Sequence, residues 1–345
     1  MTIPNDLTPY DSDAPAAARP SEPGTASGAV QRPLRVLYLA GIGRSGSTLL
    51  ERILGEVPGT CSLGEVVFLW ERGVRDDERC GCGQPFSACP FWQEVGERAF
   101  GGWQNVSVER HFELRARVDD VRRTPALLLG AFGRSFRRDL EEYVGAFRAV
   151  YEAARAVSGA ELIIDSSKYT SLAFCLRRLP DVDFRLLHLI RDSRAVAYSW
   201  TKVVRRPEVV GGESYMYRIE PPQLALIWNM HNTLLELPRL AGTPTRTLRY
   251  EDFARDPEAA LREVAAFSGL SLGTEDLGFL TSDAVQLSTS HQVAGNPLRF
   301  KTGRVEVRRD DAWRIELAAR DRRRVAAITA PVSLAFGYSP FGGRR

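Results

Sequence analysis

The chain has 345 residues, of which 44% are hydrophobic, and its formal net charge at pH 7 is +3. This length and apolar content are enough to bury one large core or two smaller ones. The small net charge does not favour a nucleic-acid partner, and no apolar run approaches the roughly 18–20 residues of a membrane span. We therefore expect a folded protein with no membrane span and no bound nucleic acid.

Residues 1–32 are rich in Pro, Ala, Ser, Gly and Asp. Such a composition cannot bury enough apolar surface to fold, so it predicts a disordered tail. The segment also lacks the basic and apolar regions of a secretory signal. We therefore expect a cytoplasmic protein whose five cysteines are reduced.

A glycine-rich loop, residues 41–48, directly follows a short apolar run, residues 34–40. A strand, a glycine loop and a helix in succession direct backbone N–H groups and a helix N-terminus toward an anion. Arg44 and three hydroxyl side chains add donors at the same place. The residues predicted to bind a phosphate group are Gly43, Arg44, Ser45, Gly46, Ser47 and Thr48.

The loop by itself is compatible with three classes of protein. It nearly matches the Walker A pattern, but Ser47 stands where that pattern requires the lysine that reaches the β/γ-phosphates. The same residues match the G-x-G-x-x-G pattern of a dinucleotide fold, with Glu65 near the spacing of the ribose-binding acid, although Arg44 is unusual in such a loop. A nucleotide hydrolase or kinase, an NAD-dependent dehydrogenase, and a transferase with a nucleotide-linked donor all remain open.

Three cysteines, Cys80, Cys82 and Cys89, lie in a Gly- and Pro-containing loop, residues 76–92. One interpretation is a zinc knuckle with Cys61 as the fourth ligand. The spacing is not the usual C-x-x-C, however, and no second pair follows. We favour a loop whose thiols are small buried hydrophobic groups, and we therefore expect no metal here.

The stretch from residue 108 to residue 157 has a helical pattern. Apolar residues recur at three- and four-residue steps between Phe136 and Ala154, with arginines and glutamates between them. Gly159 follows as a typical helix end. We interpret the arginine-rich face as a solvated helix surface.

An apolar strand is predicted over residues 162–168, ending in Asp165-Ser166-Ser167-Lys168. Asp165 could be a Walker B carboxylate that binds magnesium. The hydroxyls and the lysine, however, lie at the carboxyl end of the strand, where an open α/β sheet binds its ligands. Lys168 is there a natural partner for an anionic leaving group, and a solvated lysine is the alternative.

A second strand-to-helix transition follows residues 184–190. Arg191 closes this strand, and Ser199 lies eight residues later, about two helical turns away. A second anion site, separate from the glycine loop, is what a donor with two separated phosphates requires. His188 lies inside the apolar strand, and we interpret it as a core histidine with satisfied hydrogen bonds.

The last third of the chain continues the alternation of strands and helices. A short strand is predicted over residues 248–252, and Asp256-Pro257 begins a helix that continues to Gly269. Residues 295–303 form a polar, basic loop suited to closing over a nucleotide, with Asn296 and Arg299 as candidate ligands. Strands that alternate with helices predict a parallel sheet flanked by helices, an α/β domain over residues 33–340.

With these motifs in place, the chain resembles the sulfotransferases, in the branch that includes bacterial, carbohydrate and tyrosylprotein sulfotransferases. Residues 43–48 resemble their 5′-phosphosulfate loop, and Arg191 with Ser199 resembles their 3′-phosphate motif. Glu65 falls where tyrosylprotein sulfotransferases have their catalytic glutamate. Residues 165–168 resemble the segment with the catalytic lysine, and Tyr250 lies in a segment that resembles the adenine-side strand.

The resemblance implies a P-loop-like α/β domain that uses 3′-phosphoadenosine 5′-phosphosulfate (PAPS) as donor substrate. Glu65 would then be the base that accepts the proton of an acceptor hydroxyl or amine, and Arg44 and Lys168 would offset charge on the leaving phosphate. A sulfuryl group has less charge than a phosphoryl group, so no metal is expected, and Asp165 becomes a structural residue. The cysteine loop and the helical insertion, about residues 100–157, depart from the family. We expect the insertion on the acceptor side, and the acceptor could be a small molecule, glycan, lipid or peptide.

Overall fold

The structure is a computed structural model that describes residues 33–209, 214–281 and 283–339. The tail predicted over residues 1–32 lies outside the described residues. The described part of Pro33–Arg345 forms one compact unit.

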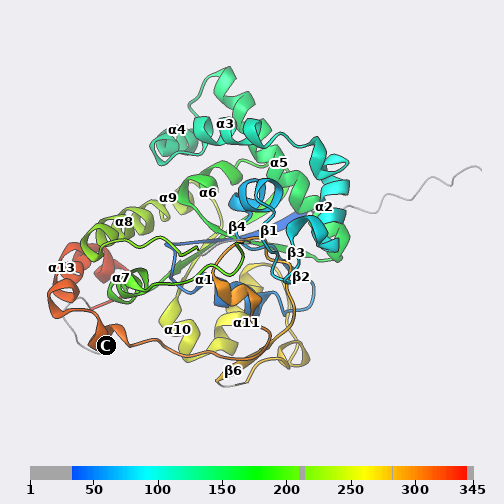
Figure 1. The fold of residues 1–345 in the computed structure, drawn as a ribbon. Helices are drawn as coiled ribbons and strands as arrows, with labels where there is room; N and C mark the ends of the chain where they lie inside the picture. Colours follow the sequence, from blue (N-terminus) through cyan, green and yellow to red (C-terminus); the bar gives the residue numbers. More distant parts are fainter. Residues whose placement is uncertain (1–32, 210–213, 282, 340–345) are drawn as a thin grey trace, which may run out of the picture. The chain divides into compact units, whose positions relative to one another are not determined.

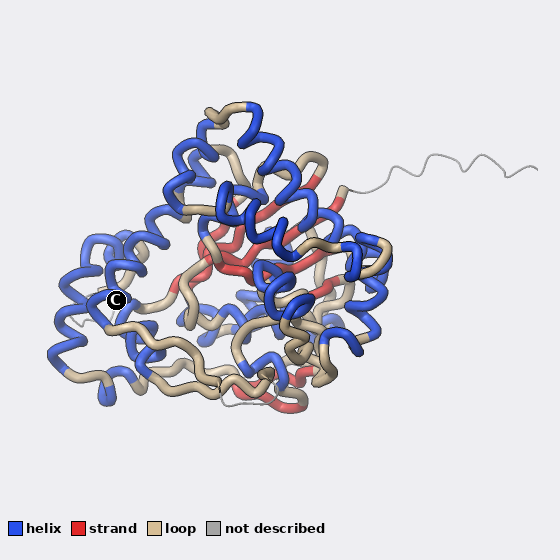
Figure 2. The backbone as a smooth tube through the Cα atoms, turned by 45° about the horizontal axis from the view of Figure 1, so that its top comes forward, coloured by secondary structure: helices blue, strands red, loops and turns tan. Residues whose placement is uncertain are grey.

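The centre of this unit is a five-stranded sheet with the strand order β2-β3-β1-β4-β5. Every pairing in it is parallel, and Figure 2 shows the strands in red between the surrounding helices. This confirms the predicted α/β fold with a parallel sheet flanked by helices. The strands are β1 (Leu34–Ala40), β2 (Thr60–Ser62), β3 (Leu162–Lys168), β4 (Val182–Ile190) and β5 (Thr245–Arg249).

The central strand β1 is buried on both of its faces. Val36 and Tyr38 belong to one apolar cluster, and Leu37 and Leu39 belong to another, because successive side chains of a strand point to opposite faces. A sheet covered on both faces explains why the strands are almost continuously apolar. The face with Val36 and Tyr38 is covered by α2 (Pro90–Phe100), α5 (Arg134–Ser158) and α6 (Thr170–Leu176). The face with Leu37 and Leu39 is covered by α1 (Ser47–Leu54), α10 (Tyr250–Arg255) and α11 (Pro257–Phe267) (Figure 1).

The helical stretch predicted after residue 108 is confirmed. It comprises α3 (Val108–Val118), α4 (Thr124–Leu129) and the long helix α5. Leu140, Phe147 and Tyr151 lie on the buried side of α5. The helix ends at Ser158, and Gly159 follows with a φ of 69°, the left-handed conformation typical of a helix C-terminus.

A third group of helices, α7 (Ser193–Thr201), α8 (Pro221–Leu234) and α13 (Ala319–Ala335), packs together around Trp228 and Val325 beside β4. A two-stranded antiparallel sheet joins β6 (Ala284–Leu287) and β7 (Gly303–Glu306). Within the described part of the chain, no helix is both long and apolar enough to cross a membrane. The short helices are Val66–Phe68, Leu69–Arg75, Phe86–Ala88, Trp103–Asn105, Val121–Arg123, α9 (Leu237–Leu240), Glu275–Leu277, Pro297–Phe300 and α12 (Trp313–Glu316).

The strand predicted over residues 248–252 is only partly correct. β5 ends at Arg249, and Tyr250 begins α10. Tyr250 and Phe253 are both buried in the apolar cluster that contains Leu37 and Leu39. This three-residue spacing suits one face of a helix rather than a strand. The helix predicted after Asp256 is confirmed as α11, whose Ala259 N–H donates to the Asp256 carboxylate at 3.0 Å.

Candidate active site

Each strand of the parallel sheet has a predicted site residue at or just beyond its carboxyl end. The glycine loop follows β1, Lys168 ends β3, and Arg191 follows β4. Glu65 comes three residues after the end of β2, and Tyr250 directly follows β5. Because the carboxyl ends of parallel strands meet at one edge of the sheet, residues far apart in the sequence converge there.

A cavity of about 720 Å³ lies at this edge of the sheet. It is lined by every predicted site residue except Ser45 and Arg299. The predicted residues that line it are Gly43, Arg44, Gly46, Ser47, Thr48, Glu65, Lys168, Arg191, Ser199, Tyr250 and Asn296.

Ser45 and Arg299 are instead completely buried. Ser45 lies within the glycine loop, and its hydroxyl has no hydrogen-bond partner among the described residues. The Arg299 guanidinium donates to the carbonyl oxygens of Gly295 and Arg79, both at 3.0 Å. Arg299 therefore orders the segment around Asn296, and the structure does not bring its side chain to the cavity.

The glycine loop presents a free helix N-terminus to the cavity. Helix α1 begins at Ser47, and within the described residues no side chain caps it, so its first N–H groups can bind an anion. Gly46 has a φ of 94°, and a Cβ added there would lie 2.4 Å from the ring of Tyr250. Only glycine therefore allows this ring to pack against the loop, where it lies 4.5 Å from the Arg191 guanidinium.

Two arginines beside the loop have unpaired buried donors. The Nε atoms of Arg44 and Arg191 are buried without a hydrogen-bond partner in the described chain. Arg191 also donates to the Arg44 carbonyl at 3.2 Å and lies 3.5 Å from the Asp310 carboxylate. Burial lowers the pKa of Arg44, and the charge of Glu65 opposes this shift. Buried polar groups are normally satisfied, so these unpaired donors are available to an anionic ligand in the cavity.

Glu65 and Lys168 form an ion pair in the wall of the cavity. Their side chains are 15% and 11% exposed, and the Lys168 Nζ lies 2.5 Å from a Glu65 carboxylate oxygen. Lys168 also donates to the Ser166 carbonyl at 3.1 Å. The register between β1 and β3 shifts just before Lys168, whose φ is 69°. This irregularity changes the direction of the end of β3, and the Lys168 side chain reaches Glu65.

Glu51, in α1, is a site residue that the sequence did not reveal. Its completely buried carboxylate accepts from the Gly64 N–H at 2.8 Å and also from the Ser166 hydroxyl. It therefore holds the backbone just before Glu65 and the side chain of Ser166, two residues before Lys168. Burial raises the pKa of Glu51 to about 7, although the Ser166 hydrogen bond and the charge of Lys168 act in the opposite direction.

This raised pKa predicts a pH-dependent stability. Folded Glu51 holds its proton up to about pH 7, whereas the unfolded chain releases it near its ordinary pKa of 4.5. The free energy of unfolding should therefore fall as the pH rises from about 4.5 to about 7, by about 3 kcal/mol from this group. Glu51→Gln should remove this contribution, so the variant should gain stability relative to the natural chain across that range. Urea unfolding at pH 5 and pH 8 measures the difference, and an equal pH dependence in both chains would contradict it.

Asp165 and His188 have the structural roles that the sequence predicted. The Asp165 carboxylate is completely buried and accepts from the Tyr151 hydroxyl at 2.5 Å and the Ser167 N–H at 2.7 Å. Burial raises the pKa of this carboxyl to about 6. The buried His188 ring lies 2.8 Å from the Asn232 amide oxygen. Both side chains are occupied within the core, which confirms these interpretations.

Several residues of the cavity wall have no signal in the sequence. The rings of Phe68 and Tyr169 meet edge to face at 5.8 Å, and the Arg72 guanidinium lies 4.0 Å from the Phe68 ring. His231 bonds to the Thr170 hydroxyl at 2.8 Å, and burial lowers its pKa. Other wall residues outside the prediction include Trp200, Arg206, Tyr215, Met216 and Tyr217.

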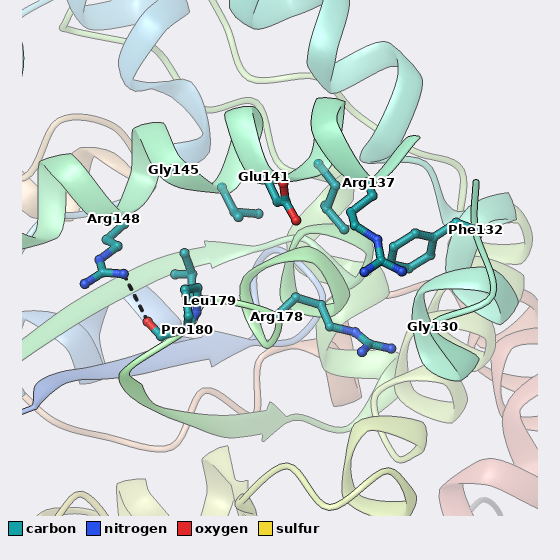
Figure 3. Close-up of a pocket in the computed structure, with 11 residues that line it drawn as sticks. Gly130, Phe132, Arg137, Glu141, Gly145, Arg148, Arg178, Leu179 and Pro180 are labelled. Carbon is teal, nitrogen blue, oxygen red and sulfur yellow. Dashed lines mark hydrogen bonds between the residues drawn. The ribbon is translucent and has the colours of Figure 1, made fainter. Parts of the chain in front are cut away.

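A second cavity, of about 400 Å³, lies between α5 and the turn that precedes β4 (Figure 3). Arg137 and Arg178 both lie near the ring of Phe132, and Arg148 donates to the Pro180 carbonyl at 3.3 Å. This cavity lies at the amino end of β4 and is lined by none of the predicted site residues. The candidate active site is therefore the cavity at the carboxyl edge.

Comparison with known proteins identifies relatives of the chain. The model of the sulfotransferase family matches residues 37–275. Human carbohydrate sulfotransferase 6 is 27% identical over 209 residues, which cover 56% of this chain and 51% of the relative. Human carbohydrate sulfotransferase 5 is 28% identical over 210 residues, which cover 56% of this chain and 49% of that relative. The chain thus spans about half the length of the curated relatives it matches.

Among solved structures, the sulfotransferase domain from the Synechococcus PCC 7002 olefin synthase superposes with a TM-score of 0.49 at 20% identity, covering 90% of this chain and 98% of that domain. The match to the family model spans more than half of the chain, and it includes the glycine loop, Glu65, Lys168, Arg191 and Tyr250. It does not favour a nucleotide hydrolase, a kinase or a dehydrogenase. The chain therefore belongs to the sulfotransferase family, whose members transfer a sulfuryl group.

Proposed function

We propose that the protein transfers a sulfuryl group from PAPS to a hydroxyl of its acceptor. The observation that supports this most directly is the convergence of two anion sites and the Glu65–Lys168 pair in one cavity. In the proposed reaction the acceptor oxygen bonds to sulfur as the bond from sulfur to the bridging phosphate oxygen breaks. The acceptor proton goes to Glu65, and 3′-phosphoadenosine 5′-phosphate leaves.

The residues of the cavity fit this donor. The uncapped N-terminus of α1 and the unpaired Nε of Arg44 would bind the phosphosulfate end. Arg191, with its own unpaired Nε, and Ser199 would bind the 3′-phosphate. Tyr250 lines the cavity between the loop and Arg191 and would border the adenosine. The bound donor would supply an activated sulfuryl group with a phosphate leaving group.

The charges of the site suit this chemistry. Lys168 and Arg44 can offset the negative charge that develops on the leaving phosphate, because a largely buried site strengthens such interactions. These two cations would thereby do what magnesium does in many phosphoryl transfers. Glu65 lies within 2.5 Å of Lys168, so the base and one of the cations are adjacent before any substrate binds.

The wall beside Glu65 supports an acceptor that has a ring. Phe68 and Tyr169 form an edge-to-face pair there, and Arg72 lies over the Phe68 ring. Aromatic walls bind the apolar faces of ring compounds, and a few polar groups fix their orientation. We infer a hydroxyl on a sugar or a similar ring. Mass spectrometry of glycan and small-molecule panels incubated with PAPS tests this, and the absence of any sulfated product across the panels would count against it.

Donor binding can be measured without knowing the acceptor. Calorimetry should show that 3′-phosphoadenosine 5′-phosphate binds more tightly than ATP with magnesium or NAD. Arg191→Ala should weaken its binding by about 1.5–3 kcal/mol, or about 10–150-fold, because a charge-assisted contact to the 3′-phosphate is lost.

Lys202→Ala is the matched control for this experiment. Lys202 lies 3.7 Å from the same Asp310 carboxylate that Arg191 contacts, but it does not line the cavity. The control should therefore bind the nucleotide as the natural chain does. Unchanged affinity in Arg191→Ala would contradict the assignment of the 3′-phosphate site.

A further inference from the structure

The donor atoms of three cysteines and a histidine lie close together. The Cys89 sulfur lies 3.6 Å from the Cys80 sulfur, 3.8 Å from the Cys82 sulfur and 3.2 Å from Nδ1 of His291. All four donor atoms lie within 4.8 Å of one another. Cys61, the fourth ligand considered from the sequence, does not belong to this group.

These distances are close to those of a tetrahedral metal site. A zinc ion with Zn–S bonds of about 2.3 Å and a Zn–N bond of about 2.0 Å holds its sulfurs about 3.8 Å apart and its nitrogen about 3.5 Å from each sulfur. A disulfide requires sulfurs about 2 Å apart, and all five cysteines are free. An iron–sulfur cluster distributes its ligands over several metal atoms, whereas these four donors converge around one point.

We propose that Cys80, Cys82, Cys89 and His291 bind one structural zinc ion. Three thiolates and one imidazole are a donor set typical of structural zinc, and four protein ligands leave no open position for catalysis. Cys80 and Cys89 are completely buried, and buried thiolates require a bound cation to compensate their charge. The sequence favoured a loop without metal because the cysteine spacing is not C-x-x-C and no second pair follows. The fold supplies the fourth ligand as His291, 202 residues after Cys89.

The chain around the cluster fixes the position of His291. Its ring stacks on the Phe91 ring, with the ring centroids 5.1 Å apart and the planes 18° apart. Its carbonyl accepts from the Trp92 indole N–H at 2.7 Å. On the other side, a Cβ at Gly81 would lie 2.9 Å from the Ser290 carbonyl, so a glycine is needed for the two segments to approach. These contacts orient the imidazole before a metal binds.

The proposed zinc site would connect the cysteine loop to a wall of the active-site cavity. Two residues after His291, the Val293 N–H donates to the Leu63 carbonyl at 3.0 Å. Gly295 then approaches Glu65 so closely that a Cβ would lie 3.2 Å from the carboxylate. Zinc bound by His291 would thus hold the segment that confines the Glu65 side chain. The inference itself rests on the cluster and does not depend on the identity of the donor or acceptor.

Metal content provides the first test. The full chain, purified under reducing conditions and dialysed against metal-free buffer, should retain about one zinc per chain by elemental analysis. Replacement of zinc by Co²⁺ should give the thiolate-to-cobalt charge-transfer and ligand-field absorption bands of a tetrahedral site. Removal of zinc by a chelator should increase hydrogen exchange in residues 288–300, and added zinc should reverse the increase.

Variants identify the ligands. Cys82→Ser and His291→Ala should each lose zinc and weaken the cobalt bands. Cys61→Ser is the matched control, because Cys61 is also a partly exposed free cysteine but lies outside the cluster, and it should retain a full equivalent of zinc.

Three results would overturn the proposal. The natural chain could hold well under one equivalent of zinc even after reconstitution with excess metal, or its cobalt complex could lack the thiolate bands. Alternatively, Cys61→Ser could lose as much zinc as Cys82→Ser. Because the first two measurements use the natural chain, they stand even if a ligand variant fails to fold.

Discussion

Replacing Glu65 by glutamine should slow sulfuryl transfer by about 10²–10⁴-fold, the usual contribution of a positioned base, and leave donor affinity close to that of the natural chain. Glutamine keeps the size of the side chain and can still accept from the Lys168 ammonium, which lies 2.5 Å from Glu65 in the structure. It cannot, however, take up the acceptor proton. The rate is measured with an identified acceptor at saturating PAPS, and affinity is measured by calorimetry with the product nucleotide.

The control for this experiment is His231, a histidine in the cavity wall. Its Nδ1 is hydrogen-bonded to the Thr170 hydroxyl, and burial lowers its pKa. His231→Asn should therefore slow transfer much less than Glu65→Gln. Full activity in Glu65→Gln would rule out the base assignment. Weakened nucleotide binding in that variant would instead indicate that Glu65 contacts the ribose.

Replacing Lys168 by methionine should lower kcat by about 10²–10³-fold, the cost of removing one preorganised donor from a site where charge develops. Methionine keeps most of the length of the side chain but removes its charge. Donor affinity should change far less than kcat, because the interaction with the leaving phosphate becomes stronger in the transition state. In the resting structure the ammonium is already occupied by Glu65 and by the Ser166 carbonyl, which limits its contribution to ground-state binding.

Lys168→Arg is the matched control, because it retains the positive charge at the same place. It should recover part of the lost rate, although its planar guanidinium differs in shape from an ammonium. The measurement is steady-state kinetics with varied PAPS at a fixed acceptor concentration. A higher KM with an unchanged kcat in Lys168→Met would show that the lysine only binds the donor.

The sequence alone determined the fold class and most of the candidate site. The apolar runs predicted over residues 34–40, 162–168 and 184–190 correspond to β1, β3 and β4. A candidate site residue or loop lies at or just after the carboxyl end of each run, and the carboxyl ends of parallel strands share one edge of the sheet. The local pattern was therefore enough to predict Lys168 at the ligand-binding edge, and the family resemblance assigned the glycine loop, Lys168 and Arg191 to one donor.

Only the tertiary structure decided how those residues are supported. A glutamate in a short amphipathic helix would normally be exposed, yet Glu51 is completely buried because α1 packs against the end of β3 and the Gly64 backbone. His291 joins the three cysteines from a distant part of the chain, and Arg299, predicted as a nucleotide ligand, is instead completely buried. These outcomes depend on packing between segments distant in the sequence, which the periodicity and spacing of neighbouring residues do not encode.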